Sequence, residues 1–257
     1  MDDSKSAPAT HRRVPAVTRA VGILRRLGAT AAPVGVNQLA RDLDLVPSTC
    51  LHILRVLVDE GLVEFDPASK RYSIGVGILP IARSAIQRNS FATLAQPNLA
   101  EFSRAFGVTA IATQLVEAQQ MVVVALSHAQ LPFRLSAELG SRFPAFISAT
   151  GRCVAAFGAF DDATLKRRFE RLKWDNPPSF DAWKADLDQT RRDGYGIDAG
   201  AYIAGVTIVA APIFDGVGAV SRSLVAIGIS EKMAAVGVPK VAGALLGMRD
   251  EIATYLL

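Results

Sequence analysis

The chain has 257 residues, half of them hydrophobic, which is enough for two domains of ordinary size, each with its own core. Its net charge of +4 comes from the first third, because residues 1–88 carry 12 Lys and Arg against 8 Asp and Glu, whereas residues 89–257 carry 16 of each. No apolar run is long enough to span a bilayer, and the polar N-terminus lacks the hydrophobic stretch of a signal peptide. The composition excludes a membrane-spanning protein, predicts a cytoplasmic one, and places the charge for phosphate binding near the N-terminus.

The two cysteines, Cys50 and Cys153, lie far apart and each falls in a helical pattern. Small buried thiols are therefore expected, and neither a disulfide nor a metal pair. The three histidines, His11, His52 and His128, do not have the spacing of metal ligands. We expect no metal ion and no cofactor.

The first residues that predict regular structure are 15–27, which have the apolar spacing of a helix. Residues 1–13 precede them and are predicted to form a disordered polar arm. Arg19 is expected on the exposed side of the helix, within reach of DNA phosphates. The inward side is predicted to contain Val17, Ala20, Val21, Leu24 and Leu27.

Residues 36–61 are predicted to form two short helices joined by a tight turn at residues 44–46. Pro47 then occupies the first turn of the second helix, where its missing N–H is not needed. The inward face of that helix contains Cys50, Leu54, Leu57 and Val58, and its polar face contains Ser48, Thr49, His52 and Arg55. A helix with this polar face can enter the major groove and contact base edges. The alternative is a helical hairpin whose polar face meets only water.

Two short strands, at residues 62–65 and 72–74, are predicted around turn-forming residues 66–69. Lys70 and Arg71 lie beside this turn, where they can contact phosphates or the minor groove. Residues 14–76 are therefore predicted to form a winged helix-turn-helix domain. A linker helix over residues 77–90 follows, and its apolar stripe, which a small domain need not bury alone, predicts a dimer: Ile78, Ile81 and Ile86.

The second half, residues 91–257, mixes strand and helix patterns. Apolar runs typical of strands occur at residues 108–117, 120–128, 133–139, 206–214 and 223–230. Helical patterns occur at residues 91–106, 149–159, 162–172, 180–192 and 238–255. Strands in pairs with helices outside them favour an α+β domain built on an antiparallel sheet.

The order and local sequence of these segments resemble the IclR family of bacterial transcription regulators. The resemblance rests in the first half on PAVTRAVGILRRL, LARDLDLVPSTCLHILRVLVDEGLVE and KRYSIGVGILPIA. In the second half it rests on GSRFPAFISATGRCVAAF, DGYGIDAGAYIAGVTIVAAPIFD and VAIGIS. It implies a winged helix-turn-helix, a helical linker and a GAF-like effector domain. It also implies dimers, often paired into tetramers, that act on operator DNA as repressors or activators of catabolic operons, commonly for organic or aromatic acids.

The resemblance also implies an effector pocket at one end of the sheet, closed by a loop whose backbone N–H groups hold a carboxylate. Ile208 and Gly228 stand where members that bind very small keto acids carry a thiol and a hydroxyl. The expected effector is therefore an aromatic or medium-sized carboxylic acid, with Asp198 accepting a hydrogen bond from a hydroxyl or amine on it. The residues that match the family's pocket are Leu135, Phe143, Ala149, Thr150, Gly151, Asp198, Val206, Ile208, Gly228 and Ser230.

Two other classes of function compete with a regulator. An enzyme could use Cys153 as nucleophile and His128 as base, although the sequence marks no third member of such a site. An interaction adaptor could keep the second domain and lack DNA binding. The polar face with Thr49, His52 and Arg55 argues against the adaptor.

Overall fold

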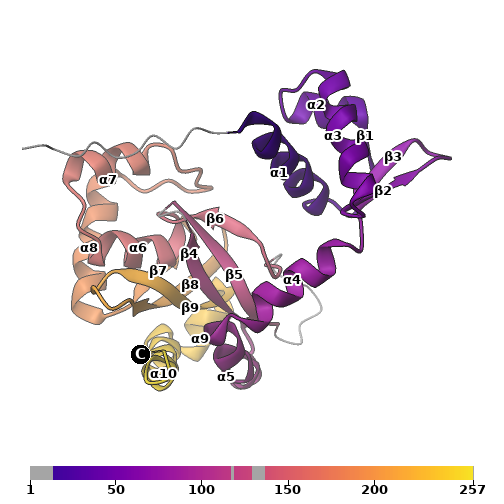
Figure 1. Ribbon diagram of the computed structural model, residues 1–257. Coiled ribbons are helices and arrows are strands. Elements are labelled where there is room, and N and C mark those ends of the chain that lie inside the picture. The colour runs from indigo at the N-terminus through magenta and orange to yellow at the C-terminus, as the bar shows by residue number, and fades with distance from the viewer. Residues whose placement is uncertain (1–13, 117–118, 129–136, 257) are drawn as a thin grey trace, which may run out of the picture. The chain divides into compact units, whose positions relative to one another are not determined.

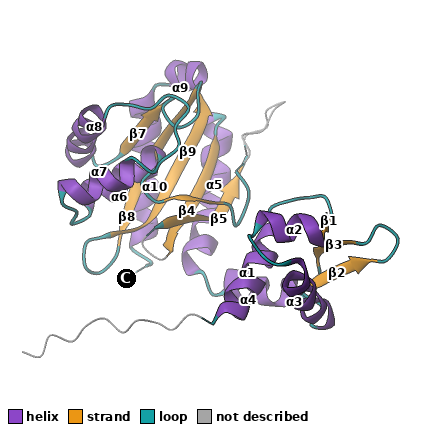
Figure 2. Cartoon of the chain, turned by 90° about the horizontal axis from the view of Figure 1, so that it is seen from above, coloured by secondary structure: helices purple, strands orange, loops and turns teal. Residues whose placement is uncertain are grey.

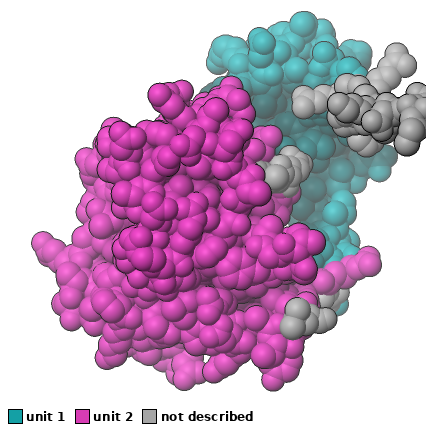
Figure 3. Space-filling view, turned by 90° about the vertical axis from the view of Figure 1, so that its left-hand side faces the viewer, with its two compact units in different colours: residues 1–85 teal, residues 86–257 magenta. Residues whose placement is uncertain are grey.

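The computed structural model describes residues 14–116, 119–128 and 137–256, so the predicted arm at residues 1–13 lies outside the described part. The chain divides into two compact units, residues 1–85 and 86–257 (Figures 1 and 3). The division falls within helix α4 (Ile78–Gln87), inside the segment expected to be the linker helix. Each unit has its own buried core and is described by itself.

The first unit is a winged helix-turn-helix, as predicted. Its strands form an antiparallel sheet in the order β1-β3-β2, of which β1 has only two residues and was not predicted. The elements in chain order are α1 (Pro15–Gly28), β1 (Val34–Gly35), α2 (Val36–Asp42), α3 (Pro47–Asp59), β2 (Val63–Asp66) and β3 (Arg71–Ile74).

Helices α1, α2 and α3 of this unit pack around one small core. Cys50 is fully buried there, as its helical position predicted. The inward face of α1 differs from the prediction, because Val17 and Val21 are 60% and 37% exposed. Leu27 is buried as predicted, and Ile23, which was not predicted to face inward, is buried beside it. Helix α1 therefore has a second apolar side that its own unit does not cover.

Local backbone geometry fixes the turn and the wing. Asp44 adopts a left-handed φ of +52°, which reverses the chain between α2 and α3. In the wing, the Asp66 carboxylate accepts hydrogen bonds from the backbone N–H groups of Ala68 and Ser69, 2.9 Å and 3.3 Å away. Lys70 completes the turn at φ +54°. The wing is thus an ordered hairpin.

The second unit is built on a six-stranded antiparallel sheet in the order β6-β5-β4-β9-β8-β7. Its strands are β4 (Thr109–Val116), β5 (Gln120–Ser127), β6 (Arg142–Pro144), β7 (Gly196–Ala199), β8 (Val206–Phe214) and β9 (Val220–Ile229). Its helices are α5 (Ser90–Phe106), α6 (Ser148–Phe157), α7 (Asp162–Phe169), α8 (Phe180–Asp193), α9 (Ser230–Val236) and α10 (Val238–Ala253).

Helices cover both faces of this sheet (Figures 1 and 2). Helices α5, α9 and α10 contribute to the core on one face, and α6 packs on the other, with α8 against it. The predicted α+β class is confirmed, and with it the antiparallel sheet flanked by helices. None of the described helices is long and apolar enough to cross a membrane.

The short elements β6, β7 and α9 were not predicted. Strands of three or four residues contain too few alternations to show a period, and the seven residues of α9 make up only two helical turns. The strand expected at residues 133–139 lies mostly outside the described residues, and the described part, residues 137–139, is not a strand.

Candidate DNA interface and ligand pocket

Helix α3 presents the predicted polar face. Ser48, His52 and Arg55 are exposed and Thr49 is half-buried, whereas Cys50 on the opposite side is buried. Pro47 begins the helix after an extended Val46, so the first turn has no side-chain cap. The four polar side chains therefore lie on one accessible surface, in the geometry that major-groove reading requires.

The basic residues outside α3 differ in whether their side chains already contact other parts of the protein. Arg19 on α1 and Lys70 at the wing turn are exposed. Arg71 is also exposed, but one Nη atom of its guanidinium donates a hydrogen bond to the carbonyl of Pro33, 3.1 Å away. This contact ties strand β3 to the loop before β1. Arg71 thus has a structural partner that Lys70 is not seen to have.

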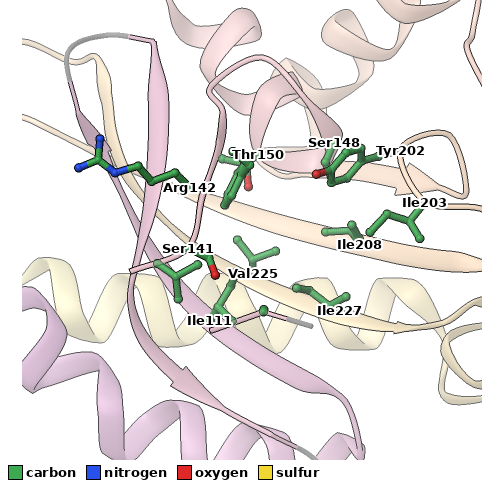
Figure 4. A pocket seen from close by; sticks show the side chains of 13 residues that line it. Ile111, Ser141, Arg142, Ser148, Thr150, Tyr202, Ile203, Ile208, Val225 and Ile227 are labelled. Carbon is green, nitrogen blue, oxygen red and sulfur yellow. The ribbon is translucent and has the colours of Figure 1, made fainter. Parts of the chain in front are cut away.

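A cavity of about 470 Å³ lies in the second unit between the sheet and the first turn of α6 (Figure 4). Its apolar wall comes mainly from β-branched side chains on four strands, β4, β5, β8 and β9. Its polar residues come from the start of α6, from β6 and the residue before it, and from the loop after β7. The lining residues are Ile111, Val123, Ala137, Ser141, Arg142, Phe143, Ser148, Thr150, Tyr202, Ile203, Ile208, Val225 and Ile227. Of the predicted pocket residues, it brings together Phe143, Thr150 and Ile208.

Helix α6 begins at the pocket with an unusual residue. Ser148 has a left-handed φ of +63°, and its hydroxyl is buried with no hydrogen-bond partner in the described structure. No side chain caps this helix, and its first internal bond runs from the N–H of Gly151 to the carbonyl of Ile147. The N–H groups of Ala149 and Thr150 therefore precede the internal bonds of the helix. Unpaired donors and the helix dipole both favour an anion here.

Gly151 does not belong to that set of donors, contrary to expectation. Its N–H is bonded to Ile147 at 2.8 Å. A Cβ at this position would lie 2.0 Å from the carbonyl carbon of Phe146, so the glycine allows α6 to pack on the preceding loop. Ala149 is buried in the same turn and only its backbone can serve the pocket.

Asp198 does not line the pocket, which contradicts the expectation that it meets the effector. It is fully buried on β7, and one of its oxygens lies 2.9 Å from a guanidinium nitrogen of Arg152. The other oxygen accepts hydrogen bonds from the backbone N–H groups of Ala201 and Tyr202. Both oxygens are thus engaged within the protein.

The end of β9 also differs from the prediction. A Cβ at Gly228 would meet Met233 at 2.8 Å, which places this position on the face opposite the pocket. Ile227 lines the cavity in its place. The hydroxyl of Ser230 accepts a hydrogen bond from Thr207, and Ser230 is the first residue of α9 rather than a pocket residue. The pocket-facing register of β9 is therefore shifted by one residue.

Two further expected residues have other outcomes. Leu135 lies outside the described residues. Val206 is buried in the same apolar cluster as Ile208 but does not line the cavity. Strand β8 therefore contributes Ile208 but not Val206 to the apolar wall. Ile111 on β4 and Val225 and Ile227 on β9 also belong to this wall.

Tyr202 and Ile203 line the pocket from the loop after β7 and were missed by sequence reasoning. Burial raises the pKa of the Tyr202 hydroxyl, and the charges of Asp175 and Asp198 raise it further. Tyr202 is therefore a neutral hydrogen-bond donor at pH 7. No pattern in the sequence AGAYIAG marks this loop as part of a pocket, since its role depends on how β7 and β8 pair.

The structure argues against Cys153 as a nucleophile. Its thiol is fully buried and donates a hydrogen bond to the carbonyl of Ala210, 3.3 Å away. Burial raises the pKa of this thiol from 9.0 to about 12, so the reactive thiolate is suppressed. Among the described residues, no cluster of three or more His, Cys, Asp or Glu could hold a metal ion.

Comparison with known proteins gives matches over both units. Residues 16–67 match the IclR helix-turn-helix domain, and residues 83–253 match the bacterial transcriptional regulator IclR C-terminal domain. The glycerol operon regulatory protein of Streptomyces griseus is 29% identical over 214 residues, covering 79% of this chain and 80% of that protein.

Two solved structures share the fold. An IclR transcriptional regulator from Alicyclobacillus acidocaldarius has a TM-score of 0.83 and 25% identity, covering 95% of this chain and 99% of that one. An IclR homologue from Microbacterium hydrocarbonoxydans, complexed with 4-hydroxybenzoate, has a TM-score of 0.76 and 17% identity, covering 93% and 98%.

Proposed function

The chain belongs to the IclR family of bacterial transcriptional regulators, and we propose that it binds operator DNA through α3 and the wing while a small organic acid in the pocket modulates that binding. Two features of one chain support this proposal most directly: an outward polar face on α3 and a mostly apolar pocket in the second unit. It acts as a sensor rather than an enzyme, in the cytoplasm. The glycerol operon regulatory protein is named for the operon that it regulates, and this chain likewise controls a catabolic operon.

On DNA, Arg55 and the neighbouring Ser48, Thr49 and His52 read base edges. Arginine suits the two acceptors of guanine, and each good base contact is worth about 1–3 kcal/mol. Arg19 and Lys70 contact phosphates, which adds affinity without sequence preference. Arg71 contributes less to phosphate binding than Lys70, because its guanidinium already holds the wing to Pro33.

In the pocket, the effector's carboxylate lies at the start of α6, against the N–H groups of Ala149 and Thr150 and the hydroxyl of Ser148. Its apolar body lies on Ile208 and Ile227. An aromatic or medium-sized acid fits this division. The Microbacterium homologue's complex with 4-hydroxybenzoate supports the same class. A very small keto acid would leave its oxygens facing apolar side chains.

The protein acts as a dimer held by its first unit. Exposed apolar side chains occur on two helices: Val17 and Val21, one turn apart on α1, and Leu79 and Ile81 on α4, the latter pair 64% and 62% exposed. A second copy of the chain would cover them, and two recognition helices would then read two half-sites. Pairing of dimers into tetramers on the operator is also part of the proposal.

The direct test has a DNA arm and a ligand arm. Gel shifts on the protein's own upstream region measure operator binding, with and without benzoate, 4-hydroxybenzoate, pyruvate and glyoxylate. Calorimetry of the full chain then measures the affinity for the same acids. We expect an aromatic acid to bind and to change operator affinity. Binding of pyruvate or glyoxylate alone would contradict the apolar pocket, and no shift with upstream DNA would contradict operator binding.

Sedimentation tests the assembly separately. A stable monomer at micromolar concentration would contradict the dimer. Exchange of Val17 and Leu79 for serine should lower the dimer's stability and leave the fold of each unit intact, since both side chains are exposed.

A further inference from the structure

Arg152 is a buried cation directly behind the pocket. It is 3% exposed, lies on α6, and does not line the cavity. Its guanidinium contacts two carboxylates: Asp186 on α8 at 2.9 Å and Asp198 on β7 at 2.9 Å. The nitrogen that contacts Asp198 also donates to the carbonyl of Ser148, 3.3 Å away. One nitrogen thus joins the first turn of α6 to β7.

Asp198 links Arg152 to the loop after β7, which lines the pocket together with the first turn of α6. Its second oxygen accepts hydrogen bonds from the N–H groups of Ala201 and Tyr202, at 3.0 Å and 3.1 Å. Both belong to residues 200–205, which we call the strap. The strap begins and ends at glycines with left-handed φ of +87° and +75°, Gly200 and Gly205. It carries Tyr202 and Ile203 to the cavity.

The strap's outer side is held by the loop before α8. Asn176 donates from its side chain to the carbonyl of Gly200 at 2.8 Å and from its backbone to that of Ala201 at 3.0 Å. The N–H of Ala204 donates to Asp175 at 2.9 Å. Hydrogen bonds therefore hold the strap on two sides, and those of the Asp198 side lead through Arg152 to the first turn of α6.

We propose that Arg152 and Asp198 are positioning residues: together they hold the strap against the first turn of α6, and so keep Tyr202 and Ser148 in register across the pocket. Neither residue contacts the ligand. The relevance of this device to regulation rests on the proposed function, but the device itself is a property of the chain alone.

The two carboxylates around Arg152 provide a matched pair of variants. Asp198→Asn leaves Arg152 paired with Asp186, and Asp186→Asn leaves it paired with Asp198. Each variant keeps the shape of the side chain and leaves one carboxylate on the guanidinium, so neither strands a buried charge. A purely structural role for Arg152 predicts similar local effects from both variants. The positioning role predicts that only Asp198→Asn loosens the strap.

Hydrogen–deuterium exchange on the full chain, without ligand, measures the strap directly. In Asp198→Asn we expect the amides of Ala201 and Tyr202 to exchange about tenfold faster than in the wild type, because the strap loses its charged anchor. In Asp186→Asn the same amides should exchange at the wild-type rate. Equal exchange of these amides in the wild type and Asp198→Asn would overturn the proposal, as would equal acceleration by both variants.

The double variant Arg152→Gln with Asp198→Asn gives a second test, because it removes both buried charges together. A faster-exchanging strap in a variant that still unfolds cooperatively supports positioning. Wild-type exchange in that variant overturns it.

Adding 4-hydroxybenzoate to the wild type separates the two proposals. Protection of the strap by this acid, combined with no effect of Asp198→Asn, sustains the effector site and overturns positioning. No response to the acid, combined with a loosened strap in Asp198→Asn, sustains positioning and counts against this effector class.

Discussion

The two units of this protein use their polar side chains in opposite ways. In the first unit, the candidate DNA-reading residues come from one helix, α3, and point away from the core. In the second, the candidate ligand-binding residues come from β4, β5, β6, α6, β8, β9 and the strap, and face an interior space. A surface that reads DNA needs only one correctly oriented helix, whereas a pocket needs several elements held in register.

The units also treat charge differently. Arg55 in the first unit is exposed and available to a partner. Arg152 in the second is buried between two carboxylates and a backbone carbonyl. A buried cation with this many partners serves the protein itself, because losing one partner would leave charge in a medium of low polarity. An exposed cation costs little to keep free for phosphate or base.

The largest effect is expected where the pocket depends on close backbone packing. Gly151→Ala would place a Cβ 2.0 Å from the carbonyl carbon of Phe146, and α6 would have to move. We expect the second unit to lose about 3 kcal/mol of unfolding free energy, with the first unit unchanged. Thermal unfolding followed by circular dichroism measures it.

Gly243→Ala is the matched control for that substitution. Gly243 lies in α10 of the same unit, and an added Cβ meets nothing within 4 Å. This variant should be as stable as the wild type or slightly more stable, because alanine favours a helix. Equal stability of the two variants would contradict the packing role of Gly151.

The second prediction concerns the first unit, where function should change and stability should not. Arg55→Ala should weaken specific operator binding by about 1–3 kcal/mol and leave non-specific binding nearly unchanged. Lys70→Ala should weaken binding to all sequences and flatten its salt dependence. Gel shifts at several salt concentrations distinguish the two. If Arg55→Ala and Thr49→Ala both leave operator affinity unchanged, α3 is not the reading helix.

The sequence predicted the candidate DNA-reading residues of the first unit better than the pocket residues of the second. The face of α3 was predicted correctly because helical period assigns each residue to a side. On β9 the assignment came from matching the family's pocket, and it placed Gly228 there, whereas Ile227 lines the cavity. The uninterrupted apolar run of this strand shows no alternation that could have corrected the match. Tyr202 was missed because its position depends on how β7 pairs with β8 and on the hydrogen bond from its N–H to Asp198, and no periodic pattern in the sequence shows either contact.

The third prediction sharpens the description of the pocket wall. Ile208→Thr should weaken binding of an aromatic acid by about 2 kcal/mol, because it removes apolar contact and adds a hydroxyl. Val206→Thr is the matched control, on the same strand and in the same apolar cluster but outside the cavity lining. Calorimetry with 4-hydroxybenzoate measures both. Similar losses of affinity in the two variants would show that Ile208 has no particular contact with the ligand.

The smallest expected effect concerns Cys153 and pH. The pKa of its thiol is raised from 9.0 to about 12 in the folded chain. The folded state therefore keeps a proton that the unfolded state loses above pH 9, so stability is full below pH 9 and falls as pH rises toward 12. At pH 10 we expect a loss of about 1 kcal/mol relative to pH 8 from this group.

Cys153→Ala isolates that contribution, because Cys50, whose thiol pKa is also raised by burial, is present in both proteins. Urea unfolding at pH 8, 9 and 10 should show a smaller decline for Cys153→Ala than for the wild type. The comparison uses the slope against pH, so a constant loss from the smaller side chain does not affect it. Parallel slopes would mean that the thiol ionises with a similar pKa in both states, and that α6 is more accessible behind the pocket than its burial indicates.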